Sequence, residues 1–241
     1  MKSKLDTSPP FSSSADDRRE NDRGAEKRIF LVEDHPITRS GIAALINLEP
    51  DLVVCGEADA APQAIELIAK ARPDLALIDI SLKSMSGIEL LKNIRGMLPH
   101  LPVLIISMHD ENIFTERALR AGANGYIMKI EASEKVLYAI RRVLEGELYL
   151  SENMKEKILR RLVKSGSEEV VFSMDTLSDR ELEVFQLIGD GYGTRQIADR
   201  LNLSVKTIDS YREHLKMKLR LDSSAELVRH AIQWLRSETM A

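Results

Sequence analysis

The sequence predicts an α/β domain with a doubly wound, parallel five-stranded sheet, followed by a small all-α domain of four helices. Five short apolar runs alternate with helix-like segments between residues 28 and 147, whereas residues 174–241 show helical periodicity alone. The apolar runs are nearly continuous, which is typical of strands that are covered on both faces. Alternation of strands and helices over this length favours right-handed crossovers and therefore a parallel sheet.

Each expected strand is followed by a segment whose apolar residues recur at helical spacing. The strands are IFLV at 29–32, LVV at 52–54, LALI at 75–78, VLII at 103–106 and YIM at 126–128. The helical segments lie between these runs, and the last one follows residue 128. Ligands of such sheets bind beyond the carboxyl ends of the strands, so a functional site is expected at that edge.

The composition, with 44% hydrophobic residues, 30% charged residues and a net charge of −4, is that of a soluble globular protein. No apolar run reaches the roughly 18 residues needed to cross a bilayer, and the first residues lack the apolar stretch of a secretory signal. The single cysteine, Cys55, excludes an internal disulfide framework and a CxxC metal site. We therefore expect a cytoplasmic protein without a membrane partner. Residues 1–27, rich in polar residues, are expected to be a disordered tail.

Polar residues follow four of the five expected strands. Glu33 and Asp34 follow the first strand, Asp79 the third, Ser107 the fourth and Lys129 the fifth. Three carboxylates at one edge repel one another, and Mg²⁺, which prefers oxygen ligands, relieves that repulsion. Asp79 can then act as a nucleophile toward a phosphoryl group, while Lys129 and Ser107 contact the phosphoryl oxygens. Each residue alone is more often a solvated charge or a helix cap, so the prediction depends on all five together.

These five residues, together with Gly87 and Tyr126, resemble the receiver domain of bacterial response regulators, a flavodoxin-like fold, over about residues 28–146. The resemblance implies that Asp79 accepts a phosphoryl group from a sensor histidine kinase. It also implies that Tyr126 swings inward when Ser107 engages the phosphoryl group. The Mg²⁺ ligands that it implies are Glu33, Asp34, Asp79 and the backbone carbonyl of Ser81.

The remainder of the chain is expected to be helical. Residues 148–173 form a helical spacer and linker, with an amphipathic helix over 151–164 and a polar SGSEE stretch at 165–169. In residues 174–241, a short helix, a tight turn at 202–204 and a longer helix predict a helix-turn-helix, whose second helix enters a major groove. The expected helix caps are Ser178 with Glu181, Thr194, Ser204, and Ser223 with Glu226.

The longer helix of the predicted helix-turn-helix has two different faces. Val205, Ile208, Leu215 and Leu219 recur at helical spacing and are expected to face the domain core. Residues 174–241 contain ten basic and eleven acidic side chains, but residues 204–220 contain five basic and two acidic ones. A locally positive face of this kind can bind phosphates, although a plain helical bundle with solvated charges would show a similar pattern.

Residues 177–235 resemble the LuxR-type helix-turn-helix domain through L-S-x-R-E at 177–181, I-A at 197–198 and S-V-K-T-I at 204–208. A receiver joined to such a domain defines the NarL/FixJ class of transcription regulators. The resemblance places Asp209, Ser210 and Glu213 at base-reading positions, and Tyr211 stands where a histidine is common. The expected DNA-contacting residues are Thr194, Ser204, Lys206, Thr207, Asp209, Ser210, Tyr211, Arg212, Glu213 and Lys216.

The sequence therefore predicts a two-component response regulator in which phosphorylation of Asp79 controls sequence-specific DNA binding and transcription. Its expected partners are a sensor histidine kinase, double-stranded DNA, a second copy of the chain in the phosphorylated or DNA-bound state, and RNA polymerase as a further candidate. It is expected to assist its own phosphoryl transfer and dephosphorylation without being a turnover enzyme. The alternatives are a receiver that acts as a phosphorylation-independent interaction module, a flavin-binding sheet, and an aspartyl-phosphate hydrolase. Such hydrolases need a second carboxylate two residues after the nucleophile, and this chain has Ser81 there.

Overall fold

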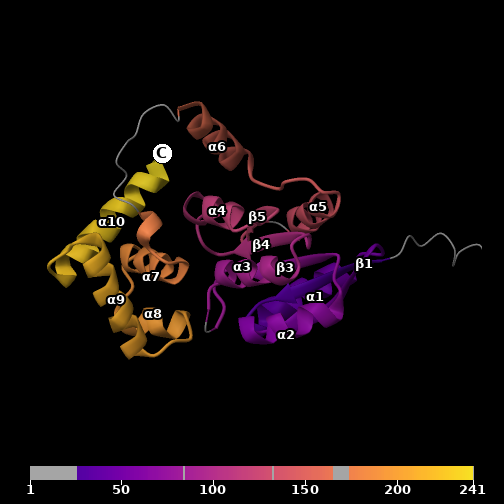
Figure 1. Ribbon diagram of the computed structural model, residues 1–241, viewed down its shortest axis with the longest axis horizontal. Coiled ribbons are helices and arrows are strands. Elements are labelled where there is room, and N and C mark those ends of the chain that lie inside the picture. Colours follow the sequence, from indigo (N-terminus) through magenta and orange to yellow (C-terminus); the bar gives the residue numbers. More distant parts are fainter. Residues whose placement is uncertain (1–25, 84, 132, 165–173, 241) are drawn as a thin grey trace, which may run out of the picture.

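The computed structural model describes residues 26–83, 85–131, 133–164 and 174–240, and it confirms the predicted fold class. An α/β domain is followed by one helix and then by an all-helical domain (Figure 1). The expected tail, apart from its last two residues, and the expected linker at 165–169 lie outside the described residues. No helix in the described part of the chain is both long enough and apolar enough to span a membrane.

The strands of the described sheet run parallel in the order β2-β1-β3-β4-β5. Their bounds are β1 Lys27–Val32, β2 Leu52–Ala58, β3 Leu75–Asp79, β4 Val103–Ser107 and β5 Gly125–Met128. Strand β1 thus begins at the last residue of the expected tail. Strands β1 and β3 are neighbours at the centre, where the strand order reverses, so a crevice is expected beyond their carboxyl ends.

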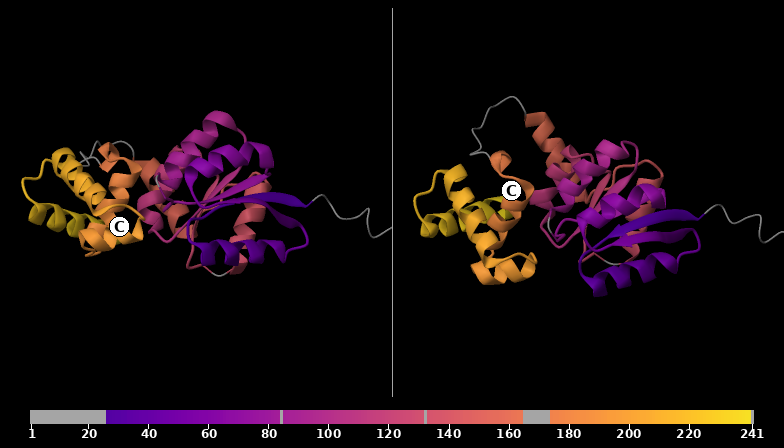
Figure 2. Two further views of the ribbon diagram at one scale, coloured as in Figure 1. Left: turned by 90° about the horizontal axis from the view of Figure 1, so that it is seen from below. Right: turned by 60° about the horizontal axis from the view of Figure 1, so that its bottom comes forward.

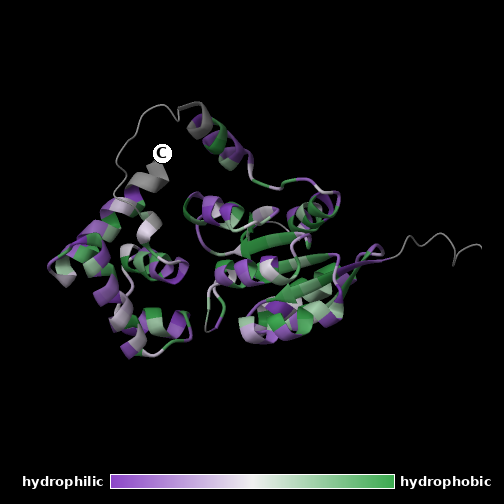
Figure 3. Ribbon diagram, in the orientation of Figure 1, coloured by the Kyte–Doolittle hydropathy of each residue, from purple (hydrophilic) through white to green (hydrophobic). Residues whose placement is uncertain are grey.

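Five helices cover the two faces of the sheet. Helices α1 (Pro36–Asn47) and α5 (Ser133–Leu144) pack on one face. Helices α2 (Ala61–Ala71), α3 (Gly87–Met97) and α4 (Glu111–Arg120) pack on the other. Successive residues of β1 therefore enter opposite hydrophobic clusters and are all buried from Ile29 to Val32. Burial on both faces explains why the strands are continuously apolar, as the colouring of Figure 3 shows.

The chain leaves α5 and runs along the outer edge of the sheet. The carbonyl of Tyr149 accepts a hydrogen bond from the amide of Tyr126 at 3.0 Å, so this short segment pairs with β5. Helix α6 (Glu152–Lys164) follows, which confirms the expected helix over 151–164. The hydroxyl of Ser151 donates to Glu111 of α4 at 2.7 Å, and Met154 is buried. The beginning of the spacer is therefore fixed to α4 and β5.

The helical domain consists of a short 3-10 helix and four α-helices, as expected. Their bounds are η1 Met174–Thr176, α7 Asp179–Gly189, α8 Thr194–Arg200, α9 Val205–Leu219 and α10 Ser224–Met240. Helices α8 and α9 are joined by the expected tight turn, in which Asn202 has a positive φ of 51°. Asparagine tolerates this left-handed conformation better than most residues.

The structure confirms two helix caps in full: the Ser178–Glu181 capping box and Ser204. The prediction for Thr194 was wrong, because Gly193 is the N-cap and Thr194 is the first helical residue. The side chain of Gln196 accepts a hydrogen bond from the Gly193 amide at 2.9 Å, which is the second half of a capping box, and Gly193 has no side chain to supply the first half. Ser223 accepts from the amide of Glu226 at 3.2 Å, as expected of a cap, but the Glu226 side chain accepts from the amide of Asp222 instead of that of Ser223.

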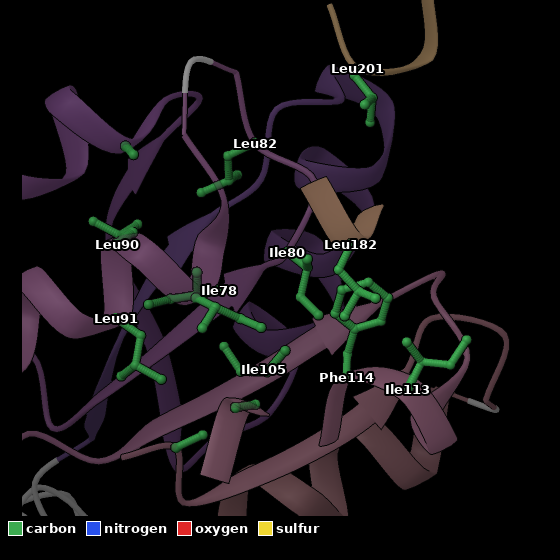
Figure 4. Packing of buried hydrophobic residues seen from close by; sticks show 14 of the residues in the cluster. Ile78, Ile80, Leu82, Leu90, Leu91, Ile105, Ile113, Phe114, Leu182 and Leu201 are labelled. Atoms are coloured by element: carbon green, nitrogen blue, oxygen red, sulfur yellow. The ribbon is translucent and has the colours of Figure 1, made fainter. Parts of the chain in front are cut away.

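The helical domain packs against one end of the α/β domain (Figure 2). Leu182 of α7 lies beside Ile80, which follows β3, and Phe114 of α4 (Figure 4). Leu82 and Leu201 belong to the same buried cluster. One hydrophobic cluster thus continues from the α/β domain into the helical domain, and the loop after β3 lies at their interface.

Candidate functional site

Three carboxylates are gathered at the carboxyl ends of β1 and β3. The relative exposures of Glu33, Asp34 and Asp79 are only 0%, 4% and 2%. The pairing of Val32 with Ile78 in the sheet register explains why the residues that follow them meet. Buried carboxylates that share a site need a nearby positive charge or a proton. The structure thus brings together the acidic residues that the sequence singled out.

Lys129 supplies a positive charge to this pocket. Its amide donates to the carbonyl of Ser107 at 2.7 Å, which holds the residue at the end of β5. Its ammonium group lies 2.5 Å from Glu33 Oε2 and 2.9 Å from Asp79 Oδ2. Although burial opposes it, the charges of Asp79 and Glu33 raise the pKa of Lys129, so this residue remains protonated. Burial raises the pKa of Asp79, while Lys129 opposes that rise.

The pocket also fits a divalent cation. Asp34 Oδ1 is buried and accepts no hydrogen bond from the described residues, although His35 Nδ1 lies 2.7 Å away. Ligand atoms of Glu33, Asp34 and His35 lie within 4.8 Å of one another. A carboxylate oxygen without a hydrogen-bond partner in an acidic pocket is an appropriate ligand for Mg²⁺. His35, which the sequence analysis did not select, adjoins this cluster with its side chain 58% exposed.

Ser107 and Tyr126 lie on neighbouring strands next to the acidic pocket. Ser107 is fully buried, and its hydroxyl oxygen accepts a hydrogen bond from the amide of His109 at 3.0 Å. Tyr126 is 1% exposed, and its hydroxyl donates to the carbonyl of His109 at 3.0 Å. Burial raises the pKa of Tyr126, so the phenol stays protonated and can donate. The aromatic side chain thus occupies an inward position and contacts the loop that follows Ser107.

Gly87 closes the loop after β3 onto the candidate nucleophile. Its amide donates to the carbonyl of Ile80 at 2.7 Å. A Cβ atom at this position would lie 1.9 Å from the backbone oxygen of Asp79, closer than real atoms approach. The absence of a side chain therefore allows α3 to begin directly against the backbone of the site.

Replacing Gly87 by Ala is expected to lower the free energy of unfolding by about 1–3 kcal/mol, because the backbone of Asp79 must move to accept the methyl group. Urea denaturation followed by circular dichroism measures this change. Gly96→Ala is the matched control, because a Cβ atom there meets nothing within 4 Å and the residue is also in α3. The control should leave stability unchanged or raise it by about 0.5–1 kcal/mol, through better helix propensity. Equal effects at the two positions would contradict the steric account.

The loops around Asp79 also contact the helical domain, which the sequence did not predict. The hydroxyl of Ser81 donates to Glu183 Oε1 of α7 at 2.6 Å and lies 2.7 Å from His109 Nε2. His109 Nε2 is 3.1 Å from the same Glu183 oxygen, and His109 Nδ1 is 2.9 Å from Gln186 Oε1. The side chain of Ser81 is therefore engaged by the helical domain, whereas the role of its carbonyl as a metal ligand remains a prediction.

Glu183 is the centre of this interface. It is fully buried, and its second oxygen accepts a hydrogen bond from Arg180 at 2.6 Å. Arg180 also donates to the carbonyl of Leu82 at 3.0 Å and therefore reaches into the α/β domain. Although burial opposes it, hydrogen bonds and nearby positive charge lower the pKa of Glu183 to about 2, so the group is ionised. The sequence carried no signal for this contact, because a carboxylate on the face opposite the apolar stripe of a helix is usually exposed to solvent.

The expected DNA-reading side of α9 is open to solvent. Lys206, Asp209, Ser210 and Glu213 are all exposed. Among the other residues expected to contact DNA, Ser204 is exposed. The half-buried ones are Thr194, Thr207, Tyr211, Arg212 and Lys216. The expected core residues Ile208, Leu215 and Leu219 are buried, but Val205 is 43% exposed, so its prediction was wrong. Val205 is the first residue of the helix, whereas Ile208, in the same turn, is fully buried.

The geometry defines an α/β domain with a buried acidic pocket, packed against a helix-turn-helix domain, and comparisons with known proteins identify the class. The family models for the response regulator receiver domain and for bacterial regulatory proteins of the luxR family match residues 29–141 and 175–231. The chain belongs to the two-component response regulators that join a receiver domain to a LuxR-type DNA-binding domain. These regulators are not known turnover enzymes, and their domains imply a sensor kinase as a partner and DNA as a ligand.

The most similar relatives include the oxygen regulatory protein NreC of Staphylococcus aureus. NreC is 33% identical over 210 residues, which are 86% of this chain and 97% of NreC. The crystal structure of a LuxR-family response regulator from Aurantimonas sp. SI85-9A1 is 34% identical, with a TM-score of 0.55 over 58% of this chain and all of that one. RcsB from Salmonella enterica serovar Typhimurium, bound to promoter rprA with phosphomimetic BeF3−, shares the fold. It is 24% identical, with a TM-score of 0.55 over 86% of this chain and 98% of RcsB.

Proposed function

We propose that this chain is a phosphorylation-controlled transcription regulator in which Asp79 is the phosphoacceptor. The observation that carries the proposal is the position of Asp79, a buried carboxylate 2.9 Å from the ammonium group of Lys129 and beside Glu33 and Asp34. A carboxylate can attack a phosphoryl group and form an acyl phosphate. The fixed charge of Lys129 can stabilise the phosphoryl oxygens during transfer, so the chain assists its own phosphorylation.

Ser107 and Tyr126 are proposed to report the phosphorylation state. A new phosphoryl group on Asp79 adds acceptor oxygens next to the Ser107 hydroxyl. Reorientation of Ser107 breaks its contact with the amide of His109, whose carbonyl holds Tyr126. The loop between β4 and α4 is thus the element that can adopt a second arrangement, and α4 carries the change toward the helical domain.

Mg²⁺ is proposed to bind between Asp34, Glu33 and Asp79, with the carbonyl of Ser81 as a further ligand. The unsatisfied Asp34 oxygen and the shortage of positive charge in the pocket support this assignment. When bound, the cation would neutralise negative charge on the phosphoryl oxygens and the carboxylates. Without the cation, Lys129 holds the carboxylates of Glu33 and Asp79, and Asn202 donates to that of Asp34.

Mg²⁺ is expected to raise the Tm of the protein, because the ion binds the folded pocket only. At a concentration a hundred times its Kd, the gain in the free energy of unfolding is about 2.7 kcal/mol. Asp34→Asn is expected to abolish most of the Tm increase, as differential scanning calorimetry can measure. Glu134→Gln, on the exposed first turn of α5, is the control and should retain the full increase. An equal Mg²⁺-dependent rise in the Asp34 variant would contradict this metal assignment.

The exposed side of α9 is proposed to enter the major groove of DNA. Lys206, Thr207 and Lys216 would contact the phosphate backbone, while Asp209, Ser210 and Glu213 would face the base edges. The exposure of Lys206 and of the three base-facing residues, together with the local excess of positive charge in residues 204–220, supports this orientation. Two copies of the chain are proposed to bind two half-sites, with RNA polymerase as a further partner.

Selection of bound sequences from a random DNA pool tests the proposal. The full chain is incubated with the pool and Mg²⁺, either with or without acetyl phosphate. We expect a defined sequence, with two related half-sites, that is enriched more strongly in the presence of acetyl phosphate. Enrichment that is unaffected by acetyl phosphate would instead support a phosphorylation-independent DNA-binding regulator. Absence of any enriched sequence would contradict the DNA-binding proposal itself.

A further inference from the structure

The interface between the two domains is built over the candidate phosphorylation site. Asn202, in the turn before α9, donates to Asp34 Oδ2 at 3.1 Å. Glu183 accepts from Ser81, two residues after Asp79. The helical domain therefore contacts side chains on both loops that carry the acidic pocket. Asp79 is only 2% exposed when the domains are docked in this way.

A second group of ion pairs holds the edge of the same interface. Asp179, at the start of α7, lies 2.8 Å from Lys92 Nζ of α3 and 3.3 Å from Arg117 Nη1 of α4. Arg117 also donates to the carbonyl of Leu177 at 2.8 Å. The interface therefore combines these ion pairs with the Glu183 network and the continuous hydrophobic cluster. Its buried polar groups on one domain have hydrogen-bond or ion-pair partners on the other.

The docked helical domain covers the phosphorylation site but leaves the DNA-reading helix uncovered. Lys206, Asp209, Ser210 and Glu213 of α9 remain exposed, whereas Glu183 and Arg180 of α7 are buried. The docked arrangement therefore restricts access to Asp79. It does not cover the base-reading side chains.

A cleft of about 1040 Å³ remains between the domains and reaches Asp79. Its lining includes Asp79, Lys129 and His109 from the α/β domain, and Gln186, Tyr192 and Arg200 from the helical domain. An acyl phosphate or a single phosphorylated amino acid is small enough to enter such a cleft. A phosphohistidine on a folded protein is surrounded by the surface of that protein, and even one helix is about 10–12 Å across with its side chains.

We propose that the helical domain, docked through Glu183, selects the phosphodonor of Asp79. Small donors reach Asp79 through the cleft in the docked state, whereas a phosphohistidine on the surface of a protein reaches it only after the domains separate. The inference rests on the proposed role of Asp79 as phosphoacceptor and adds a specificity to it. Glu183 is a positioning residue, because it acts through Ser81, His109 and Arg180 and does not touch the phosphoryl group.

The chemical step is the same for both kinds of donor. A carboxylate oxygen of Asp79 forms a bond to phosphorus while the bond from phosphorus to the donor atom breaks. For an acyl phosphate, the leaving group is a carboxylate. For a phosphohistidine, the leaving group is the imidazole nitrogen, which takes a proton from solvent. A change in docking should therefore alter which donors arrive and leave the transfer itself unchanged.

The test compares two donors that carry the same phosphoryl–imidazole bond: free phosphohistidine and the autophosphorylated cytoplasmic part of a sensor kinase. The kinase is one that phosphorylates the open variant Glu183→Ala of the full-length chain. Glu183→Ala removes the partner of Arg180, Ser81 and His109, so transfer from the kinase should be at least about tenfold faster than to the parent chain. Transfer from free phosphohistidine should change by less than about twofold, because this donor already enters the docked form.

Two further variants complete the design. The double variant Lys92→Ala/Arg117→Ala opens the interface from the α/β side and should reproduce the selective increase, even if Glu183→Ala disturbs the helical domain. Glu134→Ala, on the exposed start of α5, should behave like the parent chain with both donors. Small-angle scattering of each variant measures whether the domains have separated.

Several results would overturn the proposal. Equal kinase transfer to the parent and to both open variants would show that docking does not limit access. A parallel increase with both donors would show that Glu183 acts on the chemistry of Asp79 rather than on donor size. If free phosphohistidine labels Asp79→Asn to the same extent as the parent chain, the phosphoacceptor assignment itself has failed. This outcome differs from the two results above, which concern only the role of docking.

Discussion

Replacing Asp79 by Asn is expected to reduce phosphorylation by acetyl phosphate to below detection. The amide retains the shape of the side chain but cannot act as a nucleophile toward phosphorus. In the structure, Lys129 and Glu33 remain next to this position, so the pocket should persist. Intact-mass spectrometry of the full chain, after incubation with acetyl phosphate and Mg²⁺, measures the added phosphoryl group directly.

The matched control for this prediction is Asp209→Asn, which makes the same chemical change on the exposed side of α9. This variant should be phosphorylated as fully as the parent chain. A phosphoryl group that survives in the Asp79 variant, stable to acid but labile to hydroxylamine at another carboxylate, would refute the assignment of Asp79.

Substitutions on α9 are expected to weaken DNA binding in two distinguishable ways. Asp209→Ala, at a proposed base-reading position, should cost about 1–3 kcal/mol on the selected site and relax the preference for one base pair. Lys206→Ala, at a proposed phosphate contact, should weaken binding to all sequences and reduce the slope of log K against log salt by about 1. Fluorescence anisotropy at several salt concentrations, with the selected site and single-base variants of it, separates the two effects.

Arg229→Ala provides the control for the helix, because Arg229 is exposed on α10 and away from the reading side of α9. It should leave both the base preference and the salt slope close to those of the parent. A loss of base preference in Lys206→Ala, with none in Asp209→Ala, would mean that the helix lies in the groove with a different rotation.

The sequence predicted the α/β fold well because each strand is buried on both faces. Residues from Ile29 to Val32 are buried on alternating sides of the sheet, so the continuous apolar run follows directly from the two helical layers. Carboxyl-terminal residues of neighbouring parallel strands must meet at one edge, which explains why Glu33, Asp79 and Lys129 could be selected without coordinates.

Details that depend on a single side chain were harder to predict. Thr194 had the residue type of a helix cap, but Gly193 is the N-cap and Gln196 accepts from its amide, so the helix begins one residue earlier than expected. Val205 fits the apolar period of α9, yet it is the first residue of that helix and is 43% exposed, whereas Ile208 is fully buried. Periodicity places a residue on a face, but the length of the packed partner decides whether that face is covered.

The interface between the domains could not be predicted from the sequence. Glu183 and His109 are separated by 74 residues, and nothing in their local sequence distinguishes them from solvated charges. Their burial follows from docking of two complete domains, and each needs the other to satisfy its hydrogen bonds. Such buried polar networks can specify one arrangement of two surfaces, even where their net contribution to stability is small.

The central claim is that formation of an acyl phosphate on Asp79 changes how α9 binds DNA. The most direct measurement is the Kd of the full chain for its selected DNA site, before and after treatment with acetyl phosphate and Mg²⁺, with Asp79→Asn measured in parallel. We expect the phosphorylated parent to bind at least about tenfold more tightly, a difference of about 1.4 kcal/mol, and the variant to show no change. An unchanged Kd for a chain that mass spectrometry shows to be phosphorylated at Asp79, or an equal change in the variant, would contradict the account.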